Sequence, residues 1–191
     1  MKTRNFAITF MASILVGDIL SHGAGLALAA DVDQQLHQAL AGTKHTLAEG
    51  IAQAAGAPAG ALSANFEIKD GMLSLSVSTA EKGLATPAEK NVLKELGGSP
   101  LAEKWTPEVQ LFMDVAHVSR ASEQLTLLAL SQTSLLDIAT NAQRDQIGTI
   151  ISITPVLQNR SPLFVVQVDF NGRIVELDYN MKGERIVHWL R

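Results

Sequence analysis

Histidines and carboxylates at helical spacing are the side chains of this sequence best suited to bind a metal ion. Asp33 and His37 are four residues apart, and so are His45 and Glu49, which places each pair on one face of a helix. Each pair is either a pair of metal ligands or a solvated ion pair. His37 and His45 are about two helical turns apart, so we do not expect them to share one ion. No clustered histidine or methionine signature accompanies them, and we therefore expect surface pairs and no metal site.

Motifs of the common enzyme classes are missing from the sequence. There is no Gly-x-Ser-x-Gly, no His-Glu-x-x-His, no phosphate-binding loop and no Gly-x-Gly-x-x-Gly. The chain has no cysteine, which excludes disulfides, thiolate catalysis, zinc–thiolate sites and iron–sulfur clusters. A net charge of −4 argues against the basic face that nucleic-acid binding needs. We expect no enzyme, no cofactor and no nucleic-acid partner.

The first thirty residues have the layout of a secretory signal peptide. Lys2 and Arg4 give a basic start, and an apolar run from Phe6 to Leu20 follows. Small residues end the segment, and we place the cleavage site near Ala29. The apolar run is shorter than the roughly 20 residues that span a bilayer, which disfavours a membrane anchor. Residues 1–29 are thus predicted to be removed. The expected product is periplasmic or secreted, without stable membrane insertion, and the lack of cysteine favours a bacterial envelope.

A helix and a hairpin are predicted at the start of the exported part. Apolar residues at spacings of three and four predict helix over residues 33–55, with Gly42-Thr43 as a candidate break. Thr46 and Glu49 form the sequence signature of a capping box. Apolar and polar residues then alternate over residues 62–77 on both sides of Asp70-Gly71. This pattern predicts a β-hairpin with one buried and one solvated face.

The middle of the chain gives less uniform signals. Thr86, Pro87 and Glu89 predict a helix start, with the helix ending at residue 98. Residues 106–118 fit either a helix or a strand, and we favour a strand because of the internal repeat described below. A helical pattern returns over residues 119–130.

The last third of the chain again predicts a helix followed by strands. Ser134 and Asp137 resemble a capping box, and the helix should end near Ile147. Asn171-Gly172 is a favourable hairpin dipeptide, and Pro155 suggests an edge strand or a bulge. The expected strands cover residues 149–157, 163–170 and 173–179, with a short fourth strand within 185–190.

The two helix–hairpin segments are similar and about 88 residues apart. Thr46–Glu49 corresponds to Ser134–Asp137, and the hairpin over residues 62–77 corresponds to the one over 150–168. The alternative is that any two helix–hairpin segments look alike. We predict an α+β fold in which helices pack on an antiparallel sheet, with two such units in tandem.

The C-terminal part of the sequence resembles the PepSY domain family. That family reads as a helix followed by antiparallel strands, closing with an apolar-x-apolar-Asp strand and a Gly-Glu turn. Here the closing segment runs from Val175 to Ile186, with Asp178 and Gly183-Glu184 at the family positions. The resemblance covers residues 134–187. The first copy lacks the Gly-Glu close after Asp114 and matches less well.

The resemblance implies a division of the chain into two PepSY-like units. Residues 30–118 are expected to form a degenerate unit with a helical insertion at about 86–98, and residues 119–191 a linking helix and the clearer unit. PepSY-like domains occur in propeptides of thermolysin-type metallopeptidases and in secreted or membrane-bound bacterial proteins. The family is similar to inhibitory and binding modules and not to enzymes.

The terminal turn of the second unit is the predicted partner-binding surface. Tryptophan is enriched in binding hot spots, although Trp105 and Trp189 also suit the lid of a small core. An antiparallel sheet also leaves an edge to which an extended peptide can add. The predicted partner-binding residues are Asp178, Tyr179, Asn180, Lys182, Glu184 and Trp189.

The predicted function is therefore that of an exported, non-enzymatic binding protein of the bacterial cell envelope. Inhibition of a peptidase is one form that this function would take, and the expected partner is an envelope protein such as a peptidase or a membrane sensor. The alternative is a periplasmic accessory protein that binds a metal ion or another small ligand through its carboxylates and histidines.

Overall fold

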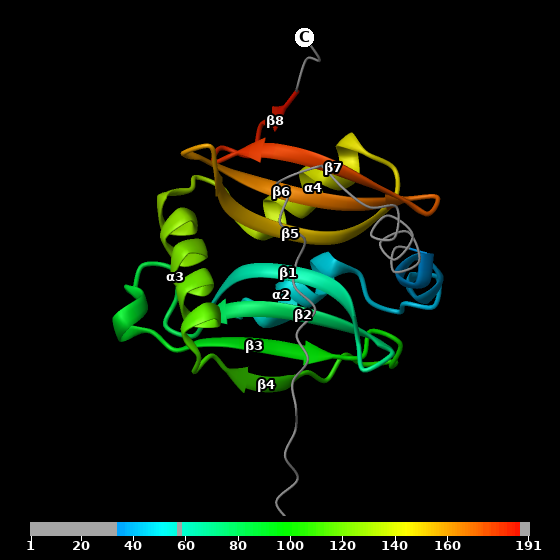
Figure 1. The fold of residues 1–191 in the computed structure, drawn as a ribbon, viewed down its shortest axis with the longest axis horizontal. Coiled ribbons are helices and arrows are strands. Elements are labelled where there is room, and N and C mark those ends of the chain that lie inside the picture. Colours follow the sequence, from blue (N-terminus) through cyan, green and yellow to red (C-terminus); the bar gives the residue numbers. More distant parts are fainter. Residues whose placement is uncertain (1–33, 57–58, 188–191) are drawn as a thin grey trace, which may run out of the picture.

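Eight antiparallel strands form one sheet in the computed structural model, counted over the residues that it describes, 34–56 and 59–187 (Figure 1). The order across the sheet is β4-β3-β2-β1-β5-β6-β7-β8. The strands are β1 (Gly60–Lys69), β2 (Met72–Ala80), β3 (Leu93–Gly98), β4 (Glu108–Leu111), β5 (Thr149–Gln158), β6 (Ser161–Phe170), β7 (Arg173–Asn180) and β8 (Arg185–Ile186). The helices are α2 (Leu47–Ala54), α3 (Val115–Leu130) and α4 (Leu135–Asp145), with a further helical stretch over residues 34–40. The predicted α+β class is confirmed.

The two halves of the chain follow the same element order and meet at the centre of the sheet. Each half reads helix, hairpin, third strand and short fourth strand. β1 pairs with β5 through Ala64 opposite Ile153 and Asn65 opposite Ser152. Each of these central strands carries a register shift at the same place, after Ala61 in β1 and about 89 residues later in β5. The halves therefore share one sheet.

Local signals read from the sequence account for the helix starts and the tight turns. Thr46 with Glu49, and Ser134 with Asp137, each form a complete capping box. The β1–β2 turn has positive φ at Asp70 (53°) and Gly71 (77°), as the hairpin prediction requires. The predicted long first helix is indeed interrupted: helix ends at residue 40 and resumes at Leu47.

The sheet has one apolar face and one polar face. Helices α2 and α4 lie behind the sheet in Figure 1, and α3 runs along its left side. Cross-strand partners share a face, so the register sorts the side chains into rows. One apolar row lies on the α2/α4 side and consists of Leu96, Val77, Ala64, Ile153, Val166 and Leu177. The adjacent polar row lies on the opposite side and consists of Gly97, Ser76, Asn65, Ser152, Gln167 and Glu176.

The helix predicted over residues 86–98 is wrong. Only Ala88–Lys90 forms a short 3-10 turn, and Leu93–Gly98 is strand β3, paired with β2. Leu93 is buried opposite Ala80. A Cβ added to Gly98 would lie 3.1 Å from the Cα of Pro107, so this glycine permits a close backbone approach. Long-range pairing therefore overrides the local helix signals.

Two further strand predictions need correction. Strand structure within residues 106–118 is confined to β4, because α3 begins at Val115 with Asp114 as its N-cap. The edge position suggested for Pro155 is wrong, since β5 lies between β1 and β6. Pro155 lies beyond the β1–β5 ladder, which ends at Ile153, so its missing N–H costs no hydrogen bond to β1.

Several predictions fall on residues outside the described part of the chain. These are the signal peptide with its cleavage site near Ala29, Trp189, and the end of the strand predicted within 185–190. Within the described part, no helix is long and apolar enough to cross a membrane.

Candidate functional site

The histidines of the described residues lie at separate places and engage separate partners. His37 Nδ1 is 2.5 Å from Asp169 Oδ2, and the second oxygen of Asp169 accepts the Gly172 N–H at 2.9 Å. This contact fixes the helical stretch 34–40 to the β6–β7 turn. His45 Nε2 is 3.0 Å from the carbonyl oxygen of Ala102. Residue 33, the other half of the predicted first pair, is not described.

The second predicted pair, His45 and Glu49, makes no direct hydrogen bond or ion pair, although hydrogen bonds from Thr46 lower the pKa of Glu49 and the nearby His45 adds to this lowering. Glu49 instead accepts the Thr46 N–H at 2.7 Å, as part of the capping box. His117 Nδ1 is 2.5 Å from Asp114 Oδ2, and its ring stacks on Phe112 with centroids 5.4 Å apart. Within the part of the chain that the structure describes, no group of three His, Asp or Glu side chains could hold a metal ion.

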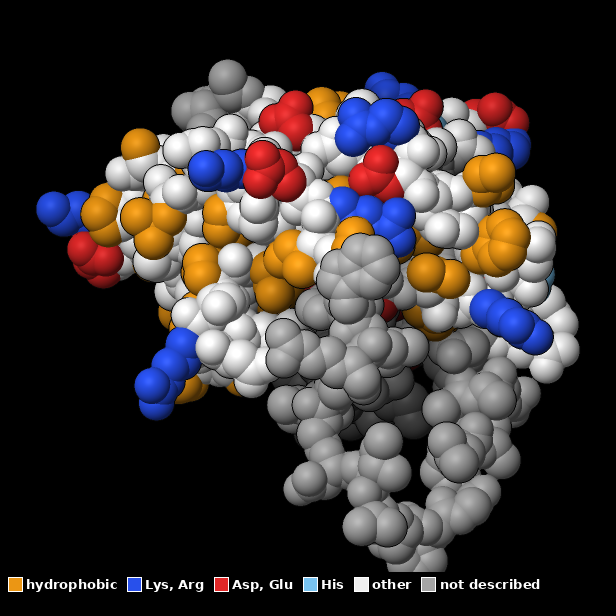
Figure 2. Space-filling model, turned by 90° about the horizontal axis from the view of Figure 1, so that it is seen from above, with side chains coloured by type: hydrophobic (Ala, Val, Ile, Leu, Met, Phe, Trp, Pro, Cys, Tyr) orange, Lys and Arg blue, Asp and Glu red, His pale blue; other side chains and the backbone are white. Residues whose placement is uncertain are grey.

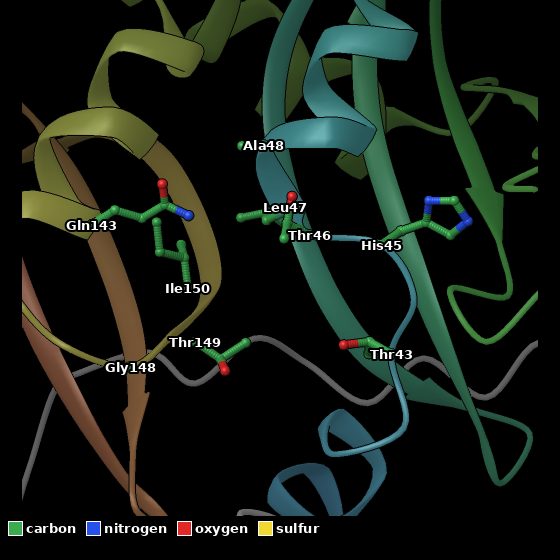
Figure 3. Close-up of a pocket in the computed structure, with 9 residues that line it drawn as sticks. All are labelled: Thr43, His45, Thr46, Leu47, Ala48, Gln143, Gly148, Thr149 and Ile150. Carbon is green, nitrogen blue, oxygen red and sulfur yellow. The ribbon is translucent and has the colours of Figure 1, made fainter. Parts of the chain in front are cut away.

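A small cavity of about 150 Å³ lies between the start of α2 and the start of β5 (Figure 3). Leu47, Gln143 and Ile150 face one another across it, whereas His45 points away from them. The Thr46 hydroxyl at its rim is committed to Glu49. The cavity thus brings together no acid–base pair and no nucleophile with its base.

Two carboxylates lie close together on the polar face of the sheet. Ser76 Oγ donates to Glu67 Oε1 at 3.0 Å, and Lys69 Nζ is 3.9 Å from Glu95 Oε1. Burial raises the pKa of Glu95, and the nearby Glu67 raises it further, against the opposing effect of Lys69. Such a carboxyl is a candidate proton donor, and the side chains that act on it are Glu67, Lys69, Ser76 and His117.

The structure removes Tyr179 from the predicted partner-binding surface. Tyr179 is fully buried, and its hydroxyl donates to Asp145 Oδ2 of α4 at 3.1 Å. Asp178 is 7% exposed on the adjacent position of β7. Successive side chains of a strand point to opposite faces of the sheet, so Tyr179 points toward α4 and Asp178 toward the polar face. Both side chains are buried.

The rest of the predicted surface is a tightly organised turn between β7 and β8. Asn180 Oδ1 accepts the N–H groups of Lys182 (2.9 Å) and Glu184 (3.1 Å), and its amide donates to Glu184 Oε2. Asn180 therefore organises the turn, with Gly183 at a φ of 81°. Lys182 and Glu184 are exposed and remain candidate contact residues. Trp105, at 1% exposure, belongs to the core.

Figure 2 looks onto the β7–β8 edge of the sheet, above the view of Figure 1. Acidic, basic and hydrophobic side chains are intermingled on the visible described surface. β8 covers β7 only opposite Asp178 and Tyr179. Among the described residues visible in this view, the chemistry is mixed and no patch carries charge of a single sign.

The opposite edge strand, β4, is a different kind of surface. All four of its residues are exposed, with Val109 at 59% and Leu111 at 53%. The Phe112 N–H donates to the Leu93 carbonyl of β3 at 3.0 Å. Backbone groups alternate in direction along a strand, so Glu108 and Gln110 also face β3. The N–H and C=O of Val109 and Leu111 therefore point away from the sheet.

Sequence reasoning did not single out this edge, although its pattern was visible. Val109, Leu111 and Met113 alternate with polar or aromatic residues, as expected of a strand with one apolar face. Their exposure follows from the position of β4 at the end of the sheet, which only the strand order reveals. Met113 is 88% exposed at the end of this row.

No protein-family model matches the sequence, and no curated protein matches it. One similar solved structure is that of a protein from Clostridium difficile 630 described as a putative lipoprotein. It is 9% identical, with a TM-score of 0.40, over 76% of this chain and 92% of that one. The PepSY resemblance stays a prediction.

Proposed function

We propose that this chain is an exported, non-enzymatic protein-binding module that takes up an extended segment of a partner protein along β4. The observation that carries the proposal is the open backbone of Val109 and Leu111 next to exposed apolar side chains. An added strand would satisfy these backbone groups and cover the apolar side chains in one step.

The lack of edge protection on β4 supports this role. Soluble proteins usually shield an edge strand with inward-pointing charges, proline, bulges or a covering helix. Here Pro107 and Glu108 stand at one end only, and the following residues Val109 to Leu111 carry no charge. A short edge with this composition is suited to reversible strand addition.

The location and the partner class rest on the sequence. The signal-peptide pattern of residues 1–29 supports export to the envelope, and the PepSY-like pattern of residues 134–187 supports a binding or inhibitory module. We propose two PepSY-like units joined in one sheet. The partner is an envelope protein such as a peptidase or a membrane sensor. If the partner is a peptidase and the bound segment lies beside its active-site cleft, binding of that segment to β4 would inhibit the peptidase. Such inhibition needs no catalytic group on the present chain.

The test compares capture by three forms of the purified protein, residues 30–191, from the envelope extract of its own organism. Leu111→Lys places a charge on the β4 edge. Ile147→Lys is the matched control, because it introduces the same charge at a side chain that is 82% exposed just after the end of α4. The wild type and Ile147→Lys should capture one partner in stoichiometric amount, and Leu111→Lys should not.

Hydrogen exchange on the captured complex adds the structural readout. The amides of residues 109 and 111 should gain protection when the partner binds. Equal capture by Leu111→Lys, or a complex without this protection, would contradict the proposed edge. Capture that a chelator abolishes would instead favour the metal-binding alternative.

A further inference from the structure

The outward groups of β4 form a self-complementary set. Val109 and Leu111 each present one N–H and one C=O, and Pro107 ends the row because it has no N–H. A second copy of the same strand, running antiparallel, offers the same groups in reverse order. A two-fold axis between the copies would place one residue of β4 opposite itself.

Four positions of this axis place a residue of β4 opposite itself, and three of them are unfavourable. With Glu108 on the axis, the two Glu108 carboxylates face each other. With Val109 on the axis, Leu111 faces Pro107 of the second copy, and two hydrogen bonds are lost for want of the proline N–H. With Leu111 on the axis, Glu108 faces Asp114 of the second copy, and the like charges meet twice.

The remaining position, with Gln110 on the axis, satisfies every outward group of Val109 and Leu111. Val109 then faces Leu111 of the second copy, and the two residues exchange hydrogen bonds on both sides of the axis. Their side chains lie on the apolar side of the sheet, where they cover each other. Met113 faces Pro107 of the second copy on the same side, so each exposed apolar residue of the segment meets an apolar residue.

The charges agree with this register. Glu108 is the one charged residue of β4, and it faces Phe112 of the second copy. Phe112 stacks on His117, whose Nδ1 is held by Asp114. In this register each Glu108 carboxylate therefore lies opposite an aromatic ring of the second copy and not opposite another carboxylate.

We infer that a second copy of this chain closes the β4 edge when no partner strand is present, with Gln110 of the two copies opposite each other. The inference rests on the proposed function, because it assigns a resting state to the same edge. The copy and the partner then compete for the same backbone groups, and strand addition to a partner requires the dimer to separate.

The absence of cysteine from the chain permits a direct test of this register. Gln110 would form a non-hydrogen-bonded pair with its own copy, with the Cα atoms about 4.5 Å apart, close enough for a disulfide. Under mild oxidation, Gln110→Cys should yield a covalent dimer. Glu108→Cys is the matched control: its two copies would be about 14 Å apart, and it should yield little dimer.

Analytical ultracentrifugation of proteins that carry no introduced cysteine gives the second measurement. The wild type and Ile147→Lys should sediment at twice the monomer mass at micromolar concentration, and Leu111→Lys at the monomer mass. A wild-type monomer at about 100 µM would overturn the inference, as would equal cross-linking of Gln110→Cys and Glu108→Cys.

The two proposals fail in different ways. Partner capture by a protein that never dimerises would retain the proposed function and overturn this inference. A dimer in the Gln110 register that captures nothing would support this inference and contradict the proposed function. Under both proposals, oxidised Gln110→Cys should lose capture of the partner and regain it on reduction, because the disulfide holds the edge closed.

Discussion

Tyr179 allows one side-chain environment to be tested without ambiguity, since it is the only tyrosine of the chain. Its ring is fully buried and its hydroxyl donates to Asp145 Oδ2. Burial raises the pKa of this hydroxyl, and the hydrogen bond and negative charge of Asp145 raise it further, well above the ordinary value of 10.0. We expect the folded protein to hold this proton at a pH where an exposed tyrosine is half ionised.

The raised pKa makes the folded state less stable at alkaline pH, by an amount that can be worked out. Above pH 10 the unfolded chain releases the tyrosine proton and the folded chain does not, so unfolding becomes easier as the pH rises. One group of this kind costs about 1 kcal/mol between pH 10 and pH 11. Below about pH 9 the hydroxyl is neutral in both states and the effect is absent.

Tyr179→Phe should remove this slope while costing some stability at neutral pH. The substitution keeps the buried ring and deletes one hydrogen bond to a carboxylate, which amounts to about 1–2 kcal/mol. Asp145 is 20% exposed, so water can replace the lost donor, and we expect the lower end of that range. For a domain of this size the melting temperature should fall by about 3 °C.

Two measurements check this reasoning. The ultraviolet absorbance of the phenolate should rise near pH 10 in urea and not in the native protein. Urea unfolding at pH 10 and 11 should show a smaller loss of stability for Tyr179→Phe than for the wild type. Lysine deprotonation affects both proteins equally, so the comparison removes its effect. Native titration near pH 10, or identical slopes, would refute the burial of this hydroxyl and restore Tyr179 as a candidate surface residue.

Three further predictions concern the framework of the sheet. Gly148 has a φ of 145°, and an added Cβ would lie 2.4 Å from the Asp169 carbonyl oxygen, so Gly148→Ala should lower the unfolding free energy in urea by about 3 kcal/mol. Ser134→Ala should cost about 1 kcal/mol in the same assay. Hydrogen bonds from Ser134 lower the pKa of Asp137. The cost of Ser134→Ala should therefore shrink as the pH falls through the folded-state pKa of Asp137 and this carboxylate becomes protonated. Burial raises the pKa of Glu95 above its unfolded value, so the ionised carboxyl destabilises the folded state. Glu95→Gln should therefore raise the melting temperature at pH 7, and the gain should disappear below about pH 4.

Local sequence signals predicted the parts of this fold that local interactions determine. The capping boxes at Thr46 and Ser134 act within four residues, and each proved complete. The turns at Asp70-Gly71 and Asn171-Gly172 depend on residues that accept positive φ, and both pairs have it. These signals need no knowledge of the rest of the chain.

The failures share a physical cause, because each depends on a partner far away in the sequence. Residues 86–98 carry good helix-start signals, but β2 offers a free edge that β3 fills. Pro155 was expected at an edge or a bulge, yet the β1–β5 ladder is so short that a central strand tolerates it. The burial of Tyr179 depends on α4, which begins 44 residues earlier, at Leu135.

The same limit applies to the candidate site. The alternation of Val109, Leu111 and Met113 identified a strand with an apolar face but could not say that this face is exposed. Exposure depends on which strand ends the sheet, and that follows from the pairing of β1 with β5 at the centre. The terminal turn was found by sequence, and the structure shows that the Asn180 side chain organises it.

The two ends of the sheet differ in length and composition, and the difference supports the proposal that β4 binds another strand. β4 and β8 are the fourth strands of their halves, so each could serve equally well as a terminating edge. β8 has two residues, one of them Arg185, and the Asn180 turn holds it close against β7. β4 has twice that length, presents Val109 and Leu111 outward, and continues into the exposed Met113. The described edge at β8 thus presents a charged residue and a turn held in place, whereas β4 presents a longer apolar strand. The contrast within one molecule therefore favours a bound strand at β4, and Leu111→Lys distinguishes this from a merely unprotected edge.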